Sequence, residues 1–309
     1  MIQAQGLSKR YGEKLAVDGL TFTVQPGKVT GFLGPNGAGK STTMRMIMGL
    51  DAPSAGSVTV NGKPYAEHAR PLAEVGALLE AKAIHTSRSA YNHLRALAAT
   101  HGISQHRVSE VVEMVGLRDV ARKRAGGFSL GMGQRLGIAS ALLGDPATVI
   151  LDEPVNGLDP EGVRWVRDLL RSWAAEGRTV FLSSHLMSEM AVTADHVIVV
   201  GQGRLIANMP IQELIGSASV DRVRVRTPDA ARLREVLARP DVTVSSSQAD
   251  VLDVHGMPVE QIGQLALDNA ILLYELTPQL ASLEEAYMDM TRDAVEYHAS
   301  TPARDRSAA

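Results

Sequence analysis

Hydrophobic and polar positions follow two patterns along the first two thirds of the chain. Short, nearly continuous apolar segments predict buried strands, and longer segments with apolar residues three or four positions apart predict helices. The expected strands are 15–24, 29–33, 58–60, 148–151, 179–183 and 196–200. The expected helices are 40–48, 89–99, 108–115, 133–143 and 160–175. Because apolar strands alternate with helices, we expect an α/β fold whose mostly parallel sheet is covered on both faces.

The pattern changes near residue 216. Beyond it, we expect strands at 220–225, 242–246, 251–254 and 271–276 and helices at 230–237 and 259–267. The order β-α-β-β-α-β is that of a ferredoxin-like split βαβ unit. One face of a final helix is marked by Leu280, Leu283, Tyr287 and Met290. We therefore predict two domains, 1–216 and 217–298, and a disordered tail, 299–309.

Composition narrows the functional classes. The 309 residues suffice for two domains, and 45% hydrophobic with 21% charged residues is typical of globular proteins. A net charge of −3 gives no indication of a nucleic-acid partner. Cysteine is absent, which excludes disulfides, thiolate zinc sites and a cysteine nucleophile. No secretory signal is expected, and no stretch approaches about 18 consecutive apolar residues, so we predict no membrane span.

A glycine-rich segment follows the strand 29–33 and opens a predicted helix. It fits the pattern G-x-x-x-x-G-K-[ST] and consists of Gly34, Pro35, Asn36, Gly37, Ala38, Gly39, Lys40 and Ser41. Its glycines let phosphate oxygens approach backbone N–H groups, and the helix N-terminus adds its dipole. Lys40 can reach the β- and γ-phosphates, and the Ser41 hydroxyl can bind Mg²⁺. The segment therefore predicts nucleotide binding rather than an ordinary glycine-rich turn.

Two carboxylates close the apolar strand that starts near residue 149. Asp152 would lie beside the phosphate loop and hold Mg²⁺ through water. Glu153 would orient or deprotonate the attacking water. A solvated acidic turn is the alternative interpretation, and the phosphate loop elsewhere in the chain argues against it.

The segment 128–135 leads into another predicted helix. Ser129 is an N-cap candidate there, and the neighbouring glycines keep the backbone accessible. A helix N-terminus with a free hydroxyl is a second phosphate site, which exceeds what one nucleotide needs. The second site is thus a candidate for a nucleotide held by another subunit, although an ordinary helix cap explains the same residues equally well.

The phosphate loop resembles the Walker A motif of ABC transporter ATP-binding subunits, the segment 128–135 resembles their signature motif, and the strand end with Asp152 and Glu153 resembles their Walker B motif. In the same order, Tyr11 resembles the aromatic residue that stacks on adenine, 157–159 the D-loop, and His185 the switch histidine near the γ-phosphate. The resemblance covers residues 1 to about 216. It implies a P-loop ATPase fold with an antiparallel β subdomain and a helical subdomain. If the resemblance is set aside, the alternative interpretation is that Tyr11 is a surface aromatic residue and that His185 caps a helix.

Two positions depart from the family pattern. Leu130 stands where the usual signature has a glycine, so the loop is less permissive, whereas Ser129 and Gly131 are kept. Glu80 stands at the position of the Q-loop glutamine, and an ionised carboxylate binds Mg²⁺ or water but cannot donate a hydrogen bond. Both departures, and the extension 217–298, resemble the drug and bacteriocin exporter branch, which includes the daunorubicin and bacitracin types.

The resemblance implies that two ATP-binding subunits, as a homodimer or pseudo-dimer, close head to tail around two ATP molecules. Glu153 would act as general base with His185 beside the γ-phosphate, while Lys40 and Mg²⁺ would stabilise the developing charge. The residues implied to contact ATP or its metal are Tyr11, Gly34–Thr42, Glu80, Asp152 and His185 of one chain and Ser129 and Gly131 of the other.

A separate transmembrane permease is implied as the partner, which would place this chain peripherally on the cytoplasmic face of the cell membrane. A cleft at 80–92 would receive a permease helix, and its loop 85–90 is either that contact or a plain surface loop. The C-terminal domain is either a regulatory, dimer-stabilising or permease-contacting module or a passive appendage. The expected function is ATP-driven drug, antibiotic or peptide efflux. The alternative is a soluble ABC-type ATPase acting on ribosomes or DNA.

Overall fold

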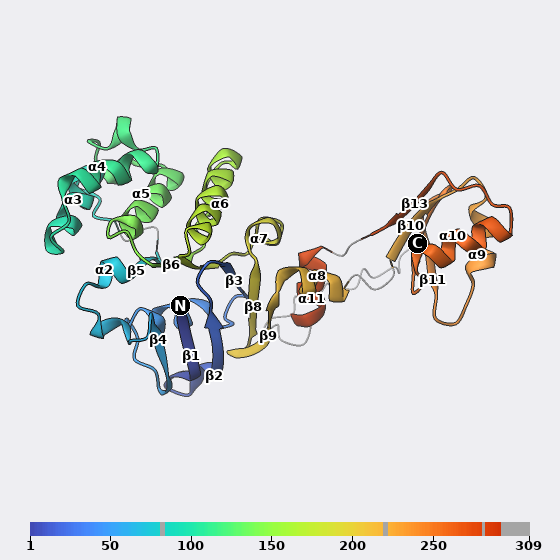
Figure 1. Cartoon of the computed structure of the whole chain (residues 1–309), viewed down its shortest axis with the longest axis horizontal. Helices are drawn as coiled ribbons and strands as arrows, with labels where there is room; N and C mark the ends of the chain where they lie inside the picture. The colour runs from blue at the N-terminus through green and yellow to red at the C-terminus, as the bar shows by residue number, and fades with distance from the viewer. Residues whose placement is uncertain (81–83, 219–221, 280–281, 292–309) are drawn as a thin grey trace, which may run out of the picture. The chain divides into compact units, whose positions relative to one another are not determined.

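The computed structural model describes residues 1–80, 84–218, 222–279 and 282–291 (Figure 1). The chain forms two compact units, one made chiefly of Met1–Pro210 and the other of Ile211–Met290. The domain boundary predicted at residue 216 falls inside α8 (Ile211–Ala218) and stays a prediction. The predicted tail, 299–309, lies outside the described residues. Across the described ranges, no helix has both the length and the apolar character that a membrane crossing requires.

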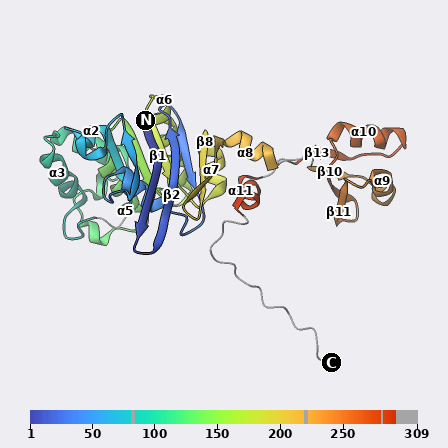
Figure 2. The same ribbon diagram turned by 90° about the horizontal axis from the view of Figure 1, so that it is seen from below.

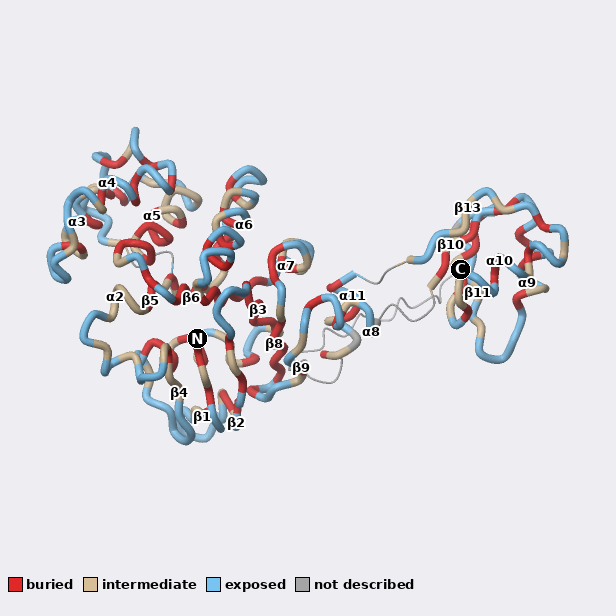
Figure 3. Tube along the Cα trace, in the orientation of Figure 1, coloured by how far each residue is buried: buried red, intermediate tan, exposed pale blue. Residues whose placement is uncertain are grey.

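A six-stranded sheet forms the centre of the first unit, in the order β5-β6-β7-β3-β8-β9. Its strands are β3 (Val29–Leu33), β5 (Val75–Leu78), β6 (Thr148–Asp152), β7 (Thr179–Ser183), β8 (His196–Gly201) and β9 (Arg204–Pro210). The first five strands pair in parallel, and β9 pairs antiparallel with β8. The expected mostly parallel sheet is confirmed. Burial is concentrated in β3, β6, β7 and β8, whereas the edge strand β9 is mostly exposed (Figure 3).

A second, antiparallel sheet has the order β2-β1-β4. It consists of β1 (Ile2–Tyr11), β2 (Lys14–Val24) and β4 (Ala55–Val60), and Figure 2 shows β1 and β2 side by side. Three phenylalanines join the two sheets: the ring centroid of Phe32 lies 6.0 Å from that of Phe22 and 5.1 Å from that of Phe181. Apolar burial between the sheets thereby fixes β2 over the central strands.

Helices lie on both sides of the central strands. They are α1 (Lys40–Ile47), α2 (Pro71–Glu74), α3 (Ala90–Thr100), α4 (Gln105–Met114), α5 (Leu130–Leu142), α6 (Pro160–Ala175) and α7 (Met187–Thr193). Short 3₁₀ turns occupy Tyr65–Glu67, Arg118–Val120 and Ala125–Gly127. Figure 1 shows α3, α4 and α5 gathered as a group, with the three-stranded sheet on the other side of the central sheet from α5 and α6.

The predicted helix at 133–143 was wrong at its start. The helix begins at Leu130, because the Ser129 side chain accepts a hydrogen bond from the Met132 N–H and caps it. Glycines at 131 and 133 weaken helix propensity and hid this first turn from the sequence pattern. The other expected helices are confirmed within a few residues.

The second unit consists of a four-stranded antiparallel sheet with helices. In chain order, its elements are α8, β10 (Arg222–Arg226), α9 (Ala230–Leu237), β11 (Thr243–Gln248), β12 (Val251–His255), α10 (Val259–Asp268), β13 (Glu275–Pro278) and α11 (Leu283–Thr291). The sheet order is β11-β12-β10-β13. Its core gathers apolar side chains from the sheet and from α9 and α10.

Two predictions for this unit need correction or fall partly outside the described residues. The strand expected at 271–276 begins only at Glu275, because Ile271 is buried in the core of the unit before the chain joins the sheet. Leu283 is buried on the final helix as expected, and Tyr287 and Met290 are partly buried. Leu280 lies outside the described residues.

Gly76 of β5 packs directly against the backbone of α5, and Gly76→Ala should destabilise the fold. A Cβ at this position would lie 1.9 Å from the Ala141 carbonyl oxygen and 2.8 Å from Pro146 Cγ. Since a helix backbone cannot yield as a side chain does, we expect the free energy of unfolding to fall by about 1–3 kcal/mol, measured by urea denaturation.

Gly133→Ala on α5 provides the matched control. Its Cβ would meet only Ile84 Cδ1, at an ordinary 3.8 Å. Alanine is up to about 1 kcal/mol better than glycine inside a helix, so stability should be unchanged or higher. Equal losses in the two variants would show that the contact between Gly76 and α5 is wrong.

Candidate nucleotide-binding site

The loop between β3 and α1 leaves the first N–H groups of the helix free of side-chain caps. Gly39 occupies the N-cap position with φ of 95°, a left-handed conformation that favours glycine, and no side chain caps the helix there. A Cβ on Gly34 would lie 2.4 Å from the Val200 carbonyl oxygen, so the loop can pass β8 only as glycine. The uncapped N-terminus of α1 presents backbone donors and a favourable dipole to an anion.

A pocket of about 310 Å³ adjoins this loop. It is lined by Tyr11, Lys14, Ala16 and every residue from Pro35 to Thr42. Lys40 lies over the loop, and its Nζ donates to the carbonyl oxygens of Gly34, at 2.6 Å, and Pro35, at 3.2 Å. Burial lowers the pKa of Lys40, and the nearby Glu153 and Asp152 carboxylates oppose that shift. The structure thus brings the predicted phosphate ligands and the predicted aromatic residue to one pocket.

Asp152 stands at the carboxyl end of β6, next to this loop. Ser41 Oγ donates to Asp152 Oδ2 at 2.8 Å, and the Ser183 hydroxyl donates to the other carboxylate oxygen. A hydroxyl and a carboxylate in contact form a pair of hard oxygen donors that fits Mg²⁺, which keeps several waters and binds phosphate oxygens. Among the residues that the structure describes, no group of three or more His, Cys, Asp or Glu side chains could hold a metal by itself.

Glu153 adopts a left-handed backbone conformation, with φ of 51°, that is rare for a residue with a side chain. Three neighbours hold it there. The Glu153 N–H donates to Ser183 Oγ at 3.1 Å, and Gln134 Nε2 donates to the Glu153 carbonyl at 2.9 Å. His185 Nδ1 lies 2.7 Å from Glu153 Oε2. Such support is what strained functional residues require.

Sequence reasoning missed Gln134 as a functional residue. Its side chain is 1% exposed and is held by the carbonyl of the predicted base. No clear signal in the sequence marks Gln134, because the charged Arg135 follows it directly and only the structure shows that the amide is buried and therefore needs a partner.

Ser129 and Gly131 lie elsewhere in the unit, at the start of α5, and do not line the pocket of the phosphate loop. A Cβ on Gly131 would lie 3.1 Å from the Gly157 carbonyl oxygen, which places this segment beside the turn 157–159. Asp159 in turn caps α6 by accepting from the Gly162 N–H at 2.9 Å. Ser129 is therefore a helix cap in this chain, and its role toward a second nucleotide stays a prediction.

Glu80 lines a different pocket, of about 440 Å³, together with Arg45, Tyr65, His93, apolar side chains that include those of β5 and α3, and Gly137 and Ser140 of α5. Of the cleft predicted at 80–92, Glu80 and Ile84 line this pocket, and 81–83 lie outside the described residues. The cleft as a whole stays a prediction. Whether Glu80 contacts the metal stays a prediction.

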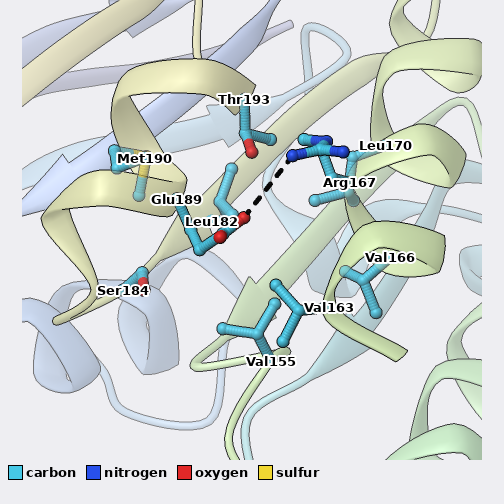
Figure 4. A pocket seen from close by; sticks show the side chains of 10 residues that line it. All are labelled: Val155, Val163, Val166, Arg167, Leu170, Leu182, Ser184, Glu189, Met190 and Thr193. Atoms are coloured by element: carbon cyan, nitrogen blue, oxygen red, sulfur yellow. Dashed lines mark ion pairs between the residues drawn. The ribbon is translucent and has the colours of Figure 1, made fainter. Parts of the chain in front are cut away.

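A tight, largely apolar pocket is lined by residues of α6 and α7, by Val155 and by Ser184, the residue before His185 (Figure 4). It separates α6 from α7 and contains an ion pair in which Arg167 Nη1 lies 3.9 Å from Glu189 Oε2. This packing links the helix that follows the turn 157–159 to the helix that follows His185.

Comparisons with known proteins agree with this geometry. Residues 17–156 match the family described as "ABC transporter", and residues 221–284 match a "Domain of unknown function (DUF8746)". The uncharacterized ABC transporter ATP-binding protein YhcH of Bacillus subtilis (strain 168) is 36% identical over 96% of this chain and 97% of its own length. The bacitracin transport ATP-binding protein BcrA of Bacillus licheniformis is 41% identical over 69% of this chain and 71% of its own.

A solved structure shares the fold of the first unit. The dimeric ATP-binding cassette MJ0796, in a post-hydrolysis state with ADP and phosphate, superposes with a TM-score of 0.62. The similarity covers 68% of this chain and 98% of that one, at 21% identity. The expected P-loop fold of the ABC ATPases is confirmed.

His93 predicts a pH-dependent stability. Burial lowers the pKa of its imidazole below the ordinary 6.5. Just below pH 6.5, His93 is therefore more often protonated in the unfolded chain than in the folded chain. The contribution is fully present above pH 6.5 and is lost as the pH falls below it. We expect the free energy of unfolding to fall by at most about 1.4 kcal/mol per pH unit in this range.

Denaturation at pH 7.5, 6.5 and 5.5 tests this expectation. His93→Gln should flatten the profile, whereas His106→Gln, whose parent side chain is 82% exposed, should leave it unchanged. Identical profiles for the wild type and His93→Gln would contradict the assignment.

Proposed function

The chain belongs to the ABC transporter ATP-binding proteins, which hydrolyse ATP, and we propose that it powers an export permease by closing with a second subunit around two ATP molecules. In this proposal, the pocket of the phosphate loop binds Mg-ATP. ATP contacts stabilise the closed pair, and hydrolysis removes those contacts.

The observation that supports this proposal best is a continuous chain of hydrogen bonds from the phosphate loop to His185. It runs from Ser41 through Asp152, Ser183 and Glu153 to His185. It therefore joins the loop that would hold the phosphates to the groups that would handle the attacking water.

Each residue then has a defined task. The N–H groups of the loop and Lys40 would hold the β- and γ-phosphates. Ser41 and Asp152 would hold Mg²⁺, which neutralises charge on the phosphate oxygens when bound. Glu153 would accept the proton of the attacking water, and His185, in contact with Glu153, would orient that carboxylate and meet the γ-phosphate.

The second subunit would complete the site with Ser129 and Gly131. Both are at the start of α5, away from the chain's own phosphate loop, and the segment is open enough for a ligand from outside. The dimeric state named for MJ0796 supports such a pairing. A homodimer or a pair with a related subunit would satisfy it equally.

The exporter assignment is supported by the relatives. BcrA is named for bacitracin transport, so a peptide antibiotic or a similar amphipathic drug is the proposed cargo class. The permease would be a separate transmembrane protein, and the chain would bind it at the cytoplasmic face of the membrane. The pocket that contains Glu80 would receive a cytoplasmic helix of the permease, because its lining is largely apolar with a few charged groups at hand.

We also propose that the second unit has the ferredoxin-like fold. If the strands are numbered along the chain, their order across the sheet is second, third, first and fourth, and every neighbouring pair is antiparallel. That arrangement is what a split βαβ unit produces. A role in stabilising the pair of subunits or in contacting the permease fits an appended domain.

Glu153→Gln should separate ATP binding from hydrolysis. The amide keeps the size of the side chain but cannot take a proton, so we expect the ATPase rate to fall at least about 100-fold. ATP binding should persist, and the variant should accumulate as a dimer with Mg-ATP in size-exclusion chromatography with light scattering. Turnover near the wild-type rate would show that the base is misassigned.

Ser129→Ala tests the contribution of α5 to the partner's ATP, and Ser104→Ala is its matched control. Both serines cap a helix by accepting from the N–H three residues on, at 3.3 and 3.2 Å. Each substitution should lower stability by about 1 kcal/mol. In the Glu153→Gln background, only Ser129→Ala should weaken ATP-dependent dimerisation, by about tenfold or more. Equal dimerisation in both variants would count against the trans role.

A further inference from the structure

Tyr11, at the end of β1, is tethered by its hydroxyl. The side chain lines the nucleotide pocket and is 47% exposed, so packing alone does not fix its ring. Its hydroxyl donates to Asp51 Oδ2 at 2.8 Å. That hydrogen bond raises the pKa of Tyr11, which keeps the phenol protonated as a donor.

Asp51 is itself held firmly. Arg45 Nε lies 2.8 Å from Asp51 Oδ2, and Arg45 Nη2 lies 3.2 Å from Oδ1, so the guanidinium grips both carboxylate oxygens. The hydrogen bonds from Arg45 and then Tyr11 lower the pKa of Asp51 and keep it ionised as an acceptor. Arg45 belongs to the last turn of α1, whose first turn lies in the phosphate loop.

A lysine limits the ring from another side. Lys9 Nζ stands 5.0 Å from the centroid of the Tyr11 ring and donates to the Ala52 carbonyl oxygen at 2.6 Å. A cation over one face of an aromatic ring is attracted to it and occupies that face. The opposite face of the ring remains for a nucleobase.

We propose that Asp51 is a positioning residue for adenine: held by Arg45, it fixes the Tyr11 ring beside the phosphate loop before ATP arrives. The inference rests on the proposed function, in which ATP occupies this pocket. The phosphate-binding loop leads into the first turn of α1, and Asp51 is bound by Arg45 in the last turn of the same helix. This one short helix therefore fixes the distance between the Tyr11 ring and the phosphate-binding loop. A ring that is already ordered costs less entropy to engage, so the tether increases affinity for the base.

Binding measurements on the full chain can isolate this effect. The variants are Tyr11→Phe, Asp51→Ala and the double variant, and the two probes are ATP and inorganic tripolyphosphate, which carries the phosphates without a base. Dissociation constants come from titration calorimetry in the presence of Mg²⁺. Melting curves identify any variant that fails to fold. If Asp51→Ala does, Tyr11→Phe carries the test, because it removes the same hydrogen bond from the other partner.

We expect Asp51→Ala to weaken ATP binding about fivefold, the effect of one hydrogen bond, and to leave tripolyphosphate binding unchanged or slightly tighter. Tyr11→Phe should weaken ATP binding by a similar factor. In the double variant the two losses should not add, because both remove the same tether. In steady-state ATPase assays the loss should appear chiefly in KM.

Three results would overturn the inference. Asp51→Ala could weaken ATP and tripolyphosphate equally, which would indicate a general structural role. Its effect could persist in full in the Tyr11→Phe background, which would show that it does not act through the phenol. Or Asp51→Ala could leave ATP affinity unchanged. If wild-type protein binds tripolyphosphate as tightly as ATP and Tyr11→Ala changes neither, the failure lies with the proposed use of Tyr11 rather than with Asp51.

Discussion

Parallel pairing of three neighbouring strands is the constraint on which the site depends. In the order β6-β7-β3, all three strands run in the same direction, so their carboxyl ends meet at one edge of the sheet. The phosphate loop follows β3, Asp152 ends β6 with Glu153 directly after it, and His185 follows β7. Register completes the arrangement, because Asp152 on β6 lies directly opposite Ser183 on β7. A crevice at the carboxyl edge is where open parallel sheets bind their ligands.

Helix α5 contacts this edge of the sheet and supports the proposed base there, although the proposed base itself follows β6. Ser129 caps the start of this helix, and Gln134, in its second turn, donates to the Glu153 carbonyl. One rigid element therefore carries both the segment proposed to meet a second subunit's ATP and the support of the strained base. Gln134 is one of the three neighbours that hold Glu153 in its left-handed conformation, so a displacement of α5 would remove part of that support.

Local signals in the sequence predicted what depends on neighbours along the chain. The strand at Val29–Leu33 and the helix at Pro160–Ala175 were predicted with correct bounds, and α1 begins at Lys40 as predicted, because continuous apolar runs, an N1 proline and a glycine pattern act within a few residues. Strand β1 was missed because its polar and apolar residues alternate irregularly around a glycine. The contacts of Gln134 and Asp51 join positions far apart or on different elements, and no spacing in the sequence reports them.

The departure at Leu130 shows how a local rule yields to packing. A leucine in place of a glycine stiffens the loop, yet here its side chain lies on Gly157: a Cβ at that residue would come within 2.2 Å of Leu130 Cδ2. Gly157 also has φ of 73°, so both its backbone and its surroundings require glycine. Leucine at position 130 restricts the backbone there, and its side chain fits only because residue 157 is a glycine without a Cβ. Leu130 remains 56% exposed, and that apolar surface lies next to the two residues proposed to contact the second subunit's nucleotide. The Leu130 side chain thus adds a second contact, besides that of Gly131, between the signature segment and the turn 157–159 of its own chain.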